Sequence, residues 1–413
     1  MKNLGIIADD LTGSLDTGVQ FSKWGISCLV GLQDSALPDV TCAIMNTDSR
    51  TMPPEAAARK VQGVAALLRE RVVYKKIDST LRGNLGAELL AAMRGLGAVK
   101  GIVAPAFPAN GRTVLAGRLF VHGLSLERTG FAKDPLNAIT EAHIPTLLQQ
   151  QTGQPAGLVE LDVVERGANA IHEAIAHRSE RIIVVDGENR KHLADIAQAI
   201  IRTDGAWLPA GSAGLAEALP GALGLSLPKN VVRPGFVPAG PVLVVAGSRN
   251  DITAAQVREL ADTLAIPLLV PDLQRWLQQT AGQDETDRIV EAVGRCLTAG
   301  KGAIVTTCFA PLLQGTSRAI AVSLGQLTLR IMDSYPVGAL LLTGGDIALQ
   351  VCLALEGLAL RPVSEVLPGL PVSQLYGGRW DGLPIITKAG GFGEKSALVV
   401  GYHYLANGSR DEQ

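Results

Sequence analysis

Short apolar runs that each end in a polar or glycine-rich turn recur along this sequence, and several turns lead into a stretch with helical periodicity. The first run, residues 4–8, contains only apolar residues and glycine and ends at Asp9 and Asp10. Short runs of this kind predict strands that are buried on both faces of a sheet. Similar runs predict strands at residues 28–31, 42–46, 72–77, 101–105, 182–186, 241–246, 303–307, 339–342 and 398–401.

Helical patterns lie between many of these runs. The clearest covers residues 53–70, which begin with two prolines and place four apolar side chains on one face. Further helices are predicted over residues 16–24, 86–93, 196–201 and 253–261, whereas residues 114–158 show no clear pattern. Strands that alternate with helices predict an α/β fold in which helices flank a mainly parallel sheet on both faces.

The length of the chain and one proline- and glycine-rich stretch predict two domains. The chain has 413 residues, whereas single hydrophobic cores stop growing at about 250–300 residues. Hydrophobic residues make up 47% of the chain and charged residues 18%, which provides apolar material for two cores. Residues 228–241 are typical of a linker. We therefore predict domains at residues 1–230 and 240–406, each with its own mainly parallel sheet, and an active cleft between them.

Charge and composition exclude several classes of protein. The formal net charge is −2 and no basic stripe is present, which argues against nucleic-acid binding. No apolar stretch reaches the ~18–20 residues of a membrane span, and the start of the chain lacks the features of a secretory signal. The cysteines form no C-x-x-C pair and the histidines no H-E-x-x-H pattern, so no zinc site held by the protein is expected. We expect a cytoplasmic protein.

Polar residues follow two of the predicted strands in the first domain. Asp9 and Asp10 follow the first strand, where they either cap the next helix or bind a polyol and act as a general base. Arg50 follows the strand at residues 42–46, where its guanidinium either grips a carboxylate or lies on a solvated turn. Because ligands collect at the carboxyl ends of parallel strands, these residues are candidates for a site.

The densest polar segment is residues 74–84, which hold cations, an acid, two hydroxyls and an amide at the end of a predicted strand. This set suits a substrate with one carboxylate and several hydroxyls. The candidate substrate-binding residues of the domain are therefore Asp10, Arg50, Lys76, Asp78, Ser79, Thr80, Leu81 and Arg82. The loop at residues 104–112 either closes one side of this pocket or is only a turn.

Three glycine-containing turns follow strands predicted in the second domain. Glycine lets the backbone approach a phosphate, and N–H groups at the start of a helix bind its charge. Neither a Walker P-loop nor a G-x-G-x-x-G fingerprint is present, and each turn alone is typical of a plain turn. Together they predict a phosphate site in the turns that hold Ser248, Gly344, Gly345, Asp346, Ile347, Gly390 and Gly391.

The order of these segments resembles that of the four-carbon acid sugar kinases. The resemblance rests on residues 6–19, 76–84, 104–112, 134–136, 211–215, 344–346 and 388–393. It implies a kinase that uses ATP to phosphorylate the terminal (O4) hydroxyl of D-threonate, D-erythronate or 3-oxo-tetronate. The sugar acid would lie in the N-terminal domain, with Asp10, Arg50 and residues 78–82, and the nucleotide in the C-terminal domain. The opening of the chain is closer to the threonate and erythronate kinases.

The resemblance also sets out a mechanism with open assignments. Either Asp10 or Asp78 is expected to orient or deprotonate the acceptor hydroxyl, and Lys76, Arg82 or Lys388 to offset developing charge. Mg²⁺ is expected to bridge the ATP phosphates near Asp346. One departure is Ile347, where the family usually has threonine.

Three alternatives remain at this stage. They are a 3-oxo-tetronate kinase, a sugar-acid-binding sensor without turnover, and a dehydrogenase, although the dinucleotide fingerprint that a dehydrogenase would carry is missing. The oligomeric state is also open, with a homodimer among the alternatives.

Overall fold

The computed structural model divides into two compact units, Met1–Val231 and Val232–Gln413. It describes residues 3–33, 37–133, 139–203, 205–226, 236, 240–248, 250–311, 313 and 315–408. Most of the predicted linker lies outside the described residues, as do Arg249 and the segment 134–136 that contributed to the family resemblance.

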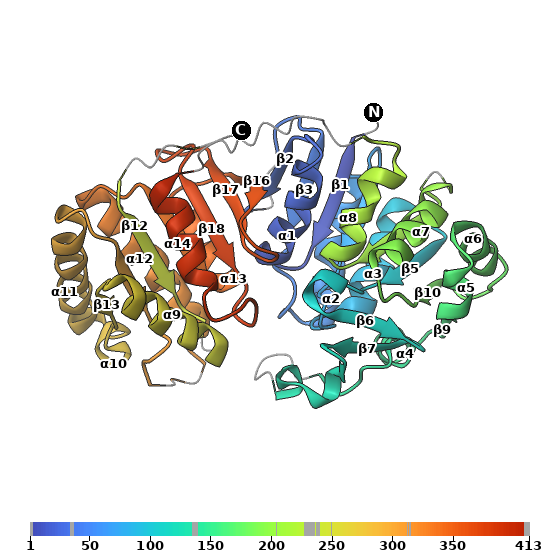
Figure 1. The fold of residues 1–413 in the computed structure, drawn as a ribbon, viewed down its shortest axis with the longest axis horizontal. Coiled ribbons are helices and arrows are strands. Elements are labelled where there is room, and N and C mark those ends of the chain that lie inside the picture. The colour runs from blue at the N-terminus through green and yellow to red at the C-terminus, as the bar shows by residue number, and fades with distance from the viewer. Residues whose placement is uncertain are drawn as a thin grey trace. The chain divides into compact units, whose positions relative to one another are not determined.

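Unit 1 is built on a sheet in which all neighbouring strands are parallel (Figure 1). The strand order is β2 (Cys28–Gly31), β3 (Cys42–Asn46), β1 (Leu4–Ala8), β4 (Val72–Lys76), β11 (Trp207–Gly211), β5 (Lys100–Ala104), β10 (Ile182–Val185) and β9 (Ala156–Val159). Nearly all of the residues in β1 to β5 and in β10 and β11 are buried, which explains why these strands appear in the sequence as continuous apolar runs.

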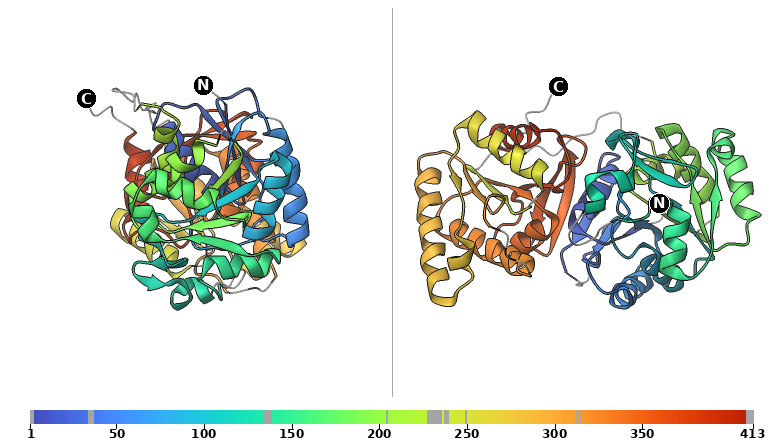
Figure 2. Two further views of the ribbon diagram at one scale, coloured as in Figure 1. Left: turned by 90° about the vertical axis from the view of Figure 1, so that its right-hand side faces the viewer. Right: turned by 90° about the horizontal axis from the view of Figure 1, so that it is seen from below.

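Helices cover both faces of this sheet. On one face, neighbouring helices pack in the order α1 (Leu11–Ser22), α8 (Ala213–Ala222), α7 (Arg190–Ile201), α6 (Ala168–Ala176) and α5 (Leu161–Glu165). On the other face the order is α2 (Pro54–Leu67), α3 (Leu85–Leu96) and α4 (Ile144–Thr152). The two views in Figure 2 show these helices as layers on either side of the sheet.

The segment between β5 and α4 forms a small antiparallel sheet of its own. It consists of η1 (Pro108–Asn110), β6 (Arg112–Leu115), β7 (Arg118–Val121), β8 (Leu124–Ser125), η2 (Leu126–Arg128) and η3 (Gly130–Lys133). The Asp186 carboxylate accepts from the N–H groups of Ala116 and Gly117 at 2.7 and 2.9 Å, which ties the β6–β7 turn to the main sheet. Elements this short carry too few residues to show a period in the sequence.

Unit 2 also has a mainly parallel sheet. Its order is β13 (Leu268–Leu269), β14 (Ala303–Thr306), β12 (Val242–Ala246), β15 (Ala339–Thr343), β18 (Pro384–Lys388), β17 (Pro371–Tyr376) and β16 (Ala359–Glu365). The first five strands are parallel, and β17 pairs antiparallel with both of its neighbours. The predicted α/β class with a mainly parallel sheet in each half of the chain is confirmed.

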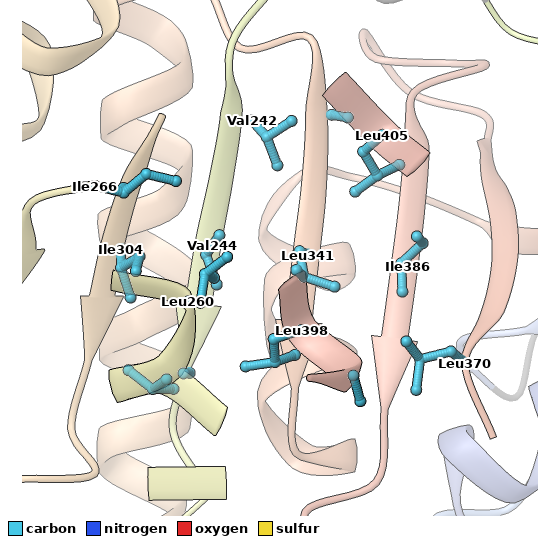
Figure 3. Close-up of a cluster of buried hydrophobic side chains, with 14 of the residues drawn as sticks. Val242, Val244, Leu260, Ile266, Ile304, Leu341, Leu370, Ile386, Leu398 and Leu405 are labelled. Atoms are coloured by element: carbon cyan, nitrogen blue, oxygen red, sulfur yellow. The ribbon is translucent and has the colours of Figure 1, made fainter. Parts of the chain in front are cut away.

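The helices of unit 2 also form two layers. One face carries α9 (Asp251–Leu264) and α14 (Ala397–Asn407), and the other carries α11 (Gln279–Thr298), α12 (Ser317–Ser334) and α13 (Gly345–Ala354), with α10 (Leu273–Trp276) before α11. In Figure 3, Leu398 and Leu405 of α14 point toward Leu341 and Ile386 of the sheet. No helix in the described ranges is both long enough and apolar enough to span a lipid bilayer.

The strand predicted at residues 398–401 is wrong, because these residues lie in α14. Leu398, Gly401 and Leu405 are buried there at a spacing of three and four residues, which is the period of a helix face. A four-residue apolar run does not distinguish a buried strand from one turn of a buried helix.

Candidate active site

Three polar segments meet at one edge of the unit 1 sheet. Strands β3, β1 and β4 are parallel neighbours, so their carboxyl ends lie side by side. The segments that follow them are residues 47–50, 9–10 and 77–82, respectively. The parallel pairing therefore gathers the predicted substrate-binding residues into one cluster, which we call the acid cluster (residues 9–13, 47–50 and 76–82).

Arg50 joins the two aspartates that follow β1. Its Nε and Nη2 donate to the carboxylate of Asp9 at 2.8 and 3.0 Å, and its Nη1 and Nη2 donate to the carboxylate of Asp10 at 2.9 and 2.7 Å. These bonds use four of the five guanidinium N–H groups. Burial would raise the pKa of Asp9, but the charge and hydrogen bonds of Arg50, together with the charges of Lys75 and Lys76, hold that pKa below its ordinary value.

Asp10 caps helix α1. Its backbone is extended, and its carboxylate accepts from the Gly13 N–H at 3.0 Å and from the Thr12 hydroxyl at 2.6 Å. The capping alternative raised by the sequence is therefore realised at Asp10, which accepts from both Arg50 and the first turn of α1. Helix α1 begins at Leu11, earlier than the predicted residue 16, because Asp10 supplies this cap.

Asp78 is held by a second guanidinium. Arg82 donates to it through Nε at 2.8 Å and Nη2 at 3.0 Å, and the Thr80 hydroxyl also donates to it. Burial would raise the pKa of Asp78, but Arg82 and Arg50 together hold it well below its ordinary value. A carboxylate in this state is ionised at neutral pH and is a weak proton acceptor.

Two polar side chains of the acid cluster, Lys76 and Ser79, have no hydrogen-bond partner among the described residues, although the Lys76 charge interacts with those of Asp9 and Asp78. Lys76 and Ser79 are 4% and 6% exposed, and neither side chain makes a hydrogen bond or an ion pair to another described residue. The Lys76 Nζ lies 2.7 Å from where a Cβ on Gly13 would be, so the ammonium faces the first turn of α1. Both groups are available to a ligand.

Leu81 has a backbone role in the cluster. Its side chain is 1% exposed, its φ of 63° is rare for a non-glycine residue, and its N–H donates to the Asp78 carbonyl at 3.0 Å. The turn from Asp78 to Arg82 is thus fixed by Asp78, whose carbonyl accepts from Leu81 and whose carboxylate accepts from Arg82.

A buried network beneath the cluster escaped the sequence analysis. Lys75 forms an ion pair with Glu88 of α3 at 2.9 Å, and both side chains are at most 3% exposed. The other Glu88 oxygen accepts from the Ser49 hydroxyl at 2.7 Å, and Ser49 in turn lies 2.7 Å from the Thr47 hydroxyl. This network anchors the turn that carries Arg50.

The predicted loop at residues 104–112 borders the acid cluster. Its last residue, Arg112, is 5% exposed, and its guanidinium interacts electrostatically with Asp78 and Arg82. Burial lowers the pKa of Arg112. The Arg82 guanidinium lies 5.8 Å from the ring centre of Phe131, so the small antiparallel sheet also reaches the cluster.

In unit 2 the three glycine turns meet at the carboxyl ends of β12, β15 and β18, which are neighbouring parallel strands. The Gly344 N–H donates to the Lys388 carbonyl at 2.9 Å. A Cβ on Gly390 would lie 2.0 Å from the Ser248 hydroxyl, so a larger residue there would displace Ser248, and Gly344 has a φ of 100° that favours glycine. We call this region the glycine site (residues 247–248, 344–347 and 389–394).

Two residues of the glycine site have roles that the sequence did not show. The Ile347 side chain is 6% exposed and packs against Gly247, so it faces the protein interior and only its backbone is left for a ligand. The Lys388 Nζ donates to the carbonyls of Ala389, Gly390 and Phe392 at 2.7, 3.3 and 2.9 Å. All three ammonium hydrogens of Lys388 therefore bind loop carbonyls, and none is left to offset negative charge on a transferring phosphoryl group, which is the role expected of it from the sequence.

Among the described residues, no group of three or more histidine, cysteine, aspartate or glutamate side chains is arranged to hold a metal ion. Asp346 is exposed in the first turn of α13, next to the glycine backbone. A Mg²⁺ ion held mainly by nucleotide phosphates and one carboxylate fits this arrangement better than an ion held by the protein alone.

Comparisons with known proteins match both halves of the chain. Residues 4–219 match the family model described as a sugar-binding N-terminal domain, and residues 243–398 match the one described as a nucleotide-binding C-terminal domain. A D-threonate kinase of Salmonella typhimurium is 37% identical over 97% of each chain. A D-erythronate kinase of Heliobacterium modesticaldum is 30% identical over 98% of this chain and 97% of its own.

More distant relatives and solved structures agree with these matches. A 3-oxo-tetronate kinase of Cupriavidus necator is 29% identical over 94% of each chain. A Salmonella typhimurium structure described as a putative tRNA synthase has a TM-score of 0.79 at 22% identity, covering 97% of this chain and 99% of its own. A Haemophilus influenzae structure has a TM-score of 0.72 at 23% identity, covering 96% and 98%. These two structures share the fold.

Proposed function

This chain belongs to the four-carbon acid sugar kinase family, and on that premise we propose that it transfers the γ-phosphoryl group of ATP to the O4 hydroxyl of a four-carbon sugar acid. D-threonate is the first candidate, because the D-threonate kinases of Salmonella typhimurium and Bordetella bronchiseptica are 37% and 35% identical. D-erythronate comes next, with a relative at 30%, and 3-oxo-tetronate after it, with relatives at 29% and below.

The observation that carries the choice of substrate class is the Lys76 ammonium, which lies in the acid cluster without a hydrogen bond to another described residue. The Lys76 side chain is 4% exposed and its charge interacts with those of Asp9 and Asp78, but its ammonium makes no hydrogen bond or ion pair to a described residue, so its N–H donors are left for an anionic ligand. The first turn of α1, next to Lys76, adds the positive end of a helix dipole. A substrate carboxylate bound there, with Arg112 nearby, accepts from these donors, and Ser79 is left to read a hydroxyl.

Asp10 is the residue that we expect to bind and orient the substrate hydroxyl that accepts the phosphoryl group. The side chain of Asp10 is 16% exposed, compared with 5% for Asp9 and 7% for Asp78. Asp78 is held in its ionised form by Arg82, so its role is to fix the Asp78–Arg82 turn rather than to take a proton. Orientation of the hydroxyl by Asp10 is sufficient for a loose phosphoryl-transfer transition state, in which little bond formation to the acceptor has occurred.

We assign the nucleotide to the glycine site. The glycines at 344 and 390 leave room for Ser248 and Ile347 to pack against the turns, and the N–H groups at the start of α13 and in the loop after β18 are donors for phosphate oxygens. Ile347 contributes only its backbone there, so the missing threonine hydroxyl leaves this site intact. Bound Mg-ATP supplies the phosphoryl group, with Asp346 near the metal directly or through water.

A coupled ADP-release assay with Mg-ATP tests the proposal. The acids are D-threonate, D-erythronate, their L forms, the 3-oxo-tetronates and glycerate. We expect turnover with one four-carbon acid, D-threonate first, and none with glycerate. Binding of ATP and of an acid without ADP release would contradict the kinase assignment and favour the sensor, and turnover with glycerate alone would contradict the substrate class.

A further inference from the structure

The loop that follows β18, residues 389–394, is held from one side by three buried side chains. Thr253 and Gln256 come from α9 and are fully buried, and Lys388 is the last residue of β18 and 1% exposed. Buried polar side chains of this kind are costly unless hydrogen-bonded. In this case all of their partners are loop carbonyl groups.

The bonds cover almost every carbonyl of the loop. Besides the three bonds of Lys388, the Gln256 Nε2 donates to the carbonyls of Phe392, Gly393 and Glu394 at 3.0, 3.1 and 2.8 Å. The Thr253 hydroxyl donates to the Gly390 carbonyl at 2.7 Å. Five of the six carbonyl groups in residues 389–394 thus point toward α9 and Lys388.

The orientation of the Gln256 amide follows from its surroundings. Its Oε1 is buried and has no hydrogen-bond partner among the described residues. A flipped amide would set this oxygen against the three carbonyl oxygens that now accept from Nε2, which is electrostatically unfavourable. The loop therefore fixes Gln256 as a donor, even though one of its acceptor positions is left unsatisfied.

Carbonyls held on one side of a chain place N–H groups on the other. In a trans peptide the C=O of one residue and the N–H of the next point in opposite directions. The inward carbonyls of Ala389, Gly390 and Phe392 thus turn the N–H groups of Gly390, Gly391 and Gly393 outward. None of these three N–H groups donates to another described residue.

We propose that Thr253, Gln256 and Lys388 are positioning residues, which turn the loop carbonyls inward and thereby aim its N–H groups at the phosphates of the nucleotide. This inference rests on the proposed function. Successive backbone N–H groups on one side of a loop form an anion-binding concavity. The three side chains keep the carbonyl oxygens, which would repel phosphate, on the far side of the loop.

The test compares binding of Mg-ADP to the purified full chain and to two variants, Gln256→Met and Lys388→Met, by isothermal titration calorimetry. Both substitutions keep side-chain length and remove the donors. We expect the Kd for ADP to rise about tenfold or more in each variant, while the KM for the sugar acid stays within about twofold. Loss of folded protein alone would lower kcat without changing Kd.

Lys395→Met is the matched control. Lys395 lies directly after the loop, but its Nζ pairs with Glu259 on the surface at 2.6 Å instead of with loop carbonyls. We expect the ADP affinity of this variant to equal that of the wild type. An equal loss in Lys395→Met and Lys388→Met would overturn the inference, because general charge near the site would then explain both.

The remaining outcomes separate a failure of this inference from a failure of the proposed function. Folded Gln256→Met and Lys388→Met proteins that bind ADP as the wild type does would overturn the inference and leave the kinase assignment intact. A wild type that binds no ADP would overturn both. If neither variant folds, amide exchange in the unaltered chain decides, because the inference requires ADP to slow exchange at Gly390, Gly391 and Gly393.

Discussion

At the scale of single residues, the acid cluster separates groups that are tied to the protein from groups that are left for a ligand. Arg50 and Arg82 each grip an aspartate on two sides, which fixes both partners at the end of a strand. Lys76 and Ser79 are equally buried and have no such tie among the described residues. We therefore expect binding of the sugar acid to depend most on Lys76 and Ser79, whose side chains make the fewest hydrogen bonds to other described residues.

Lys76→Met removes the ammonium but keeps the length of the side chain. We expect the KM for the sugar acid to rise roughly thirtyfold or more, which corresponds to the loss of about 2 kcal/mol from a charge-assisted bond. The KM for ATP should stay unchanged. Lys191→Met, at an exposed lysine paired with Asp195, is the control, and an equal effect there would contradict the role of Lys76.

Two substitutions test the two aspartate roles separately. Asp10→Asn tests the orientation of the acceptor hydroxyl, and Asp78→Asn tests the anchoring of Arg82. Asp10→Asn should lower kcat by about a hundredfold, because the acceptor loses its carboxylate partner. Asp78→Asn should mainly raise the KM for the acid, because Arg82 loses its anchor. Steady-state kinetics on both variants checks this, and near-wild-type turnover in both would show that neither aspartate acts on the acceptor.

Lys388 predicts a dependence of stability on pH. Burial lowers its pKa from 10.5 to about 7 in the folded protein. Between these values the unfolded chain binds more protons than the folded one, so the contribution of Lys388 to stability rises as the pH rises. The free energy of unfolding of the wild type minus that of Lys388→Met should increase from about pH 7 to about pH 9 in urea titrations. The titratable group that interacts with Lys388 is Cys308, which raises this pKa and so opposes the effect of burial. A difference that does not change with pH would contradict the burial of the Lys388 charge.

At the scale of secondary-structure elements, the alternation of side chains along β4 divides two adjacent lysines between support and function. Lys75 and Lys76 point to opposite faces of the sheet, as successive residues of a strand do. Lys75 meets Glu88 of α3, whereas Lys76 faces the first turn of α1 on the other side. One strand end thus both anchors the Arg50 turn and presents a cation to a ligand.

Glu88→Gln breaks the buried ion pair under the acid cluster. Because an uncompensated Lys75 ammonium would remain in the interior, we expect the protein to lose about 3–5 kcal/mol of stability. The double variant Lys75→Met with Glu88→Leu should lose less, since it buries no charge. Urea unfolding of the three proteins checks this, and equal stability of Glu88→Gln and wild type would contradict the account.

The sequence predicted strands and the motifs that directly follow them, but it did not predict contacts between residues that lie far apart in the chain. Strands β1, β2 and β3 lie at the predicted residues, and the motifs at their ends supplied the members of the acid cluster. Glu88 and Gln256 were missed because each sits on a helix and meets its partners from far along the chain. Gln256 contacts carbonyls more than 130 residues away, and no pattern around it signals this role.

At the scale of the whole molecule, the two halves of the chain share one arrangement, for which we propose two different ligands. Each unit contains a run of neighbouring parallel strands and a set of turns at their carboxyl ends. In unit 1 the turns carry charged side chains, and in unit 2 they carry glycines. The proposed division between a sugar acid and a nucleotide follows from this difference in chemistry.

The most direct test of the central claim is the stoichiometry of the reaction. The wild-type chain is incubated with D-threonate and Mg-ATP, and ADP and phosphorylated acid are quantified together by chromatography and mass spectrometry. The account predicts equimolar ADP and threonate 4-phosphate, with ADP release that depends on the acid. ADP without phosphorylated acid, or neither product from any four-carbon acid despite binding of both ligands, would contradict it.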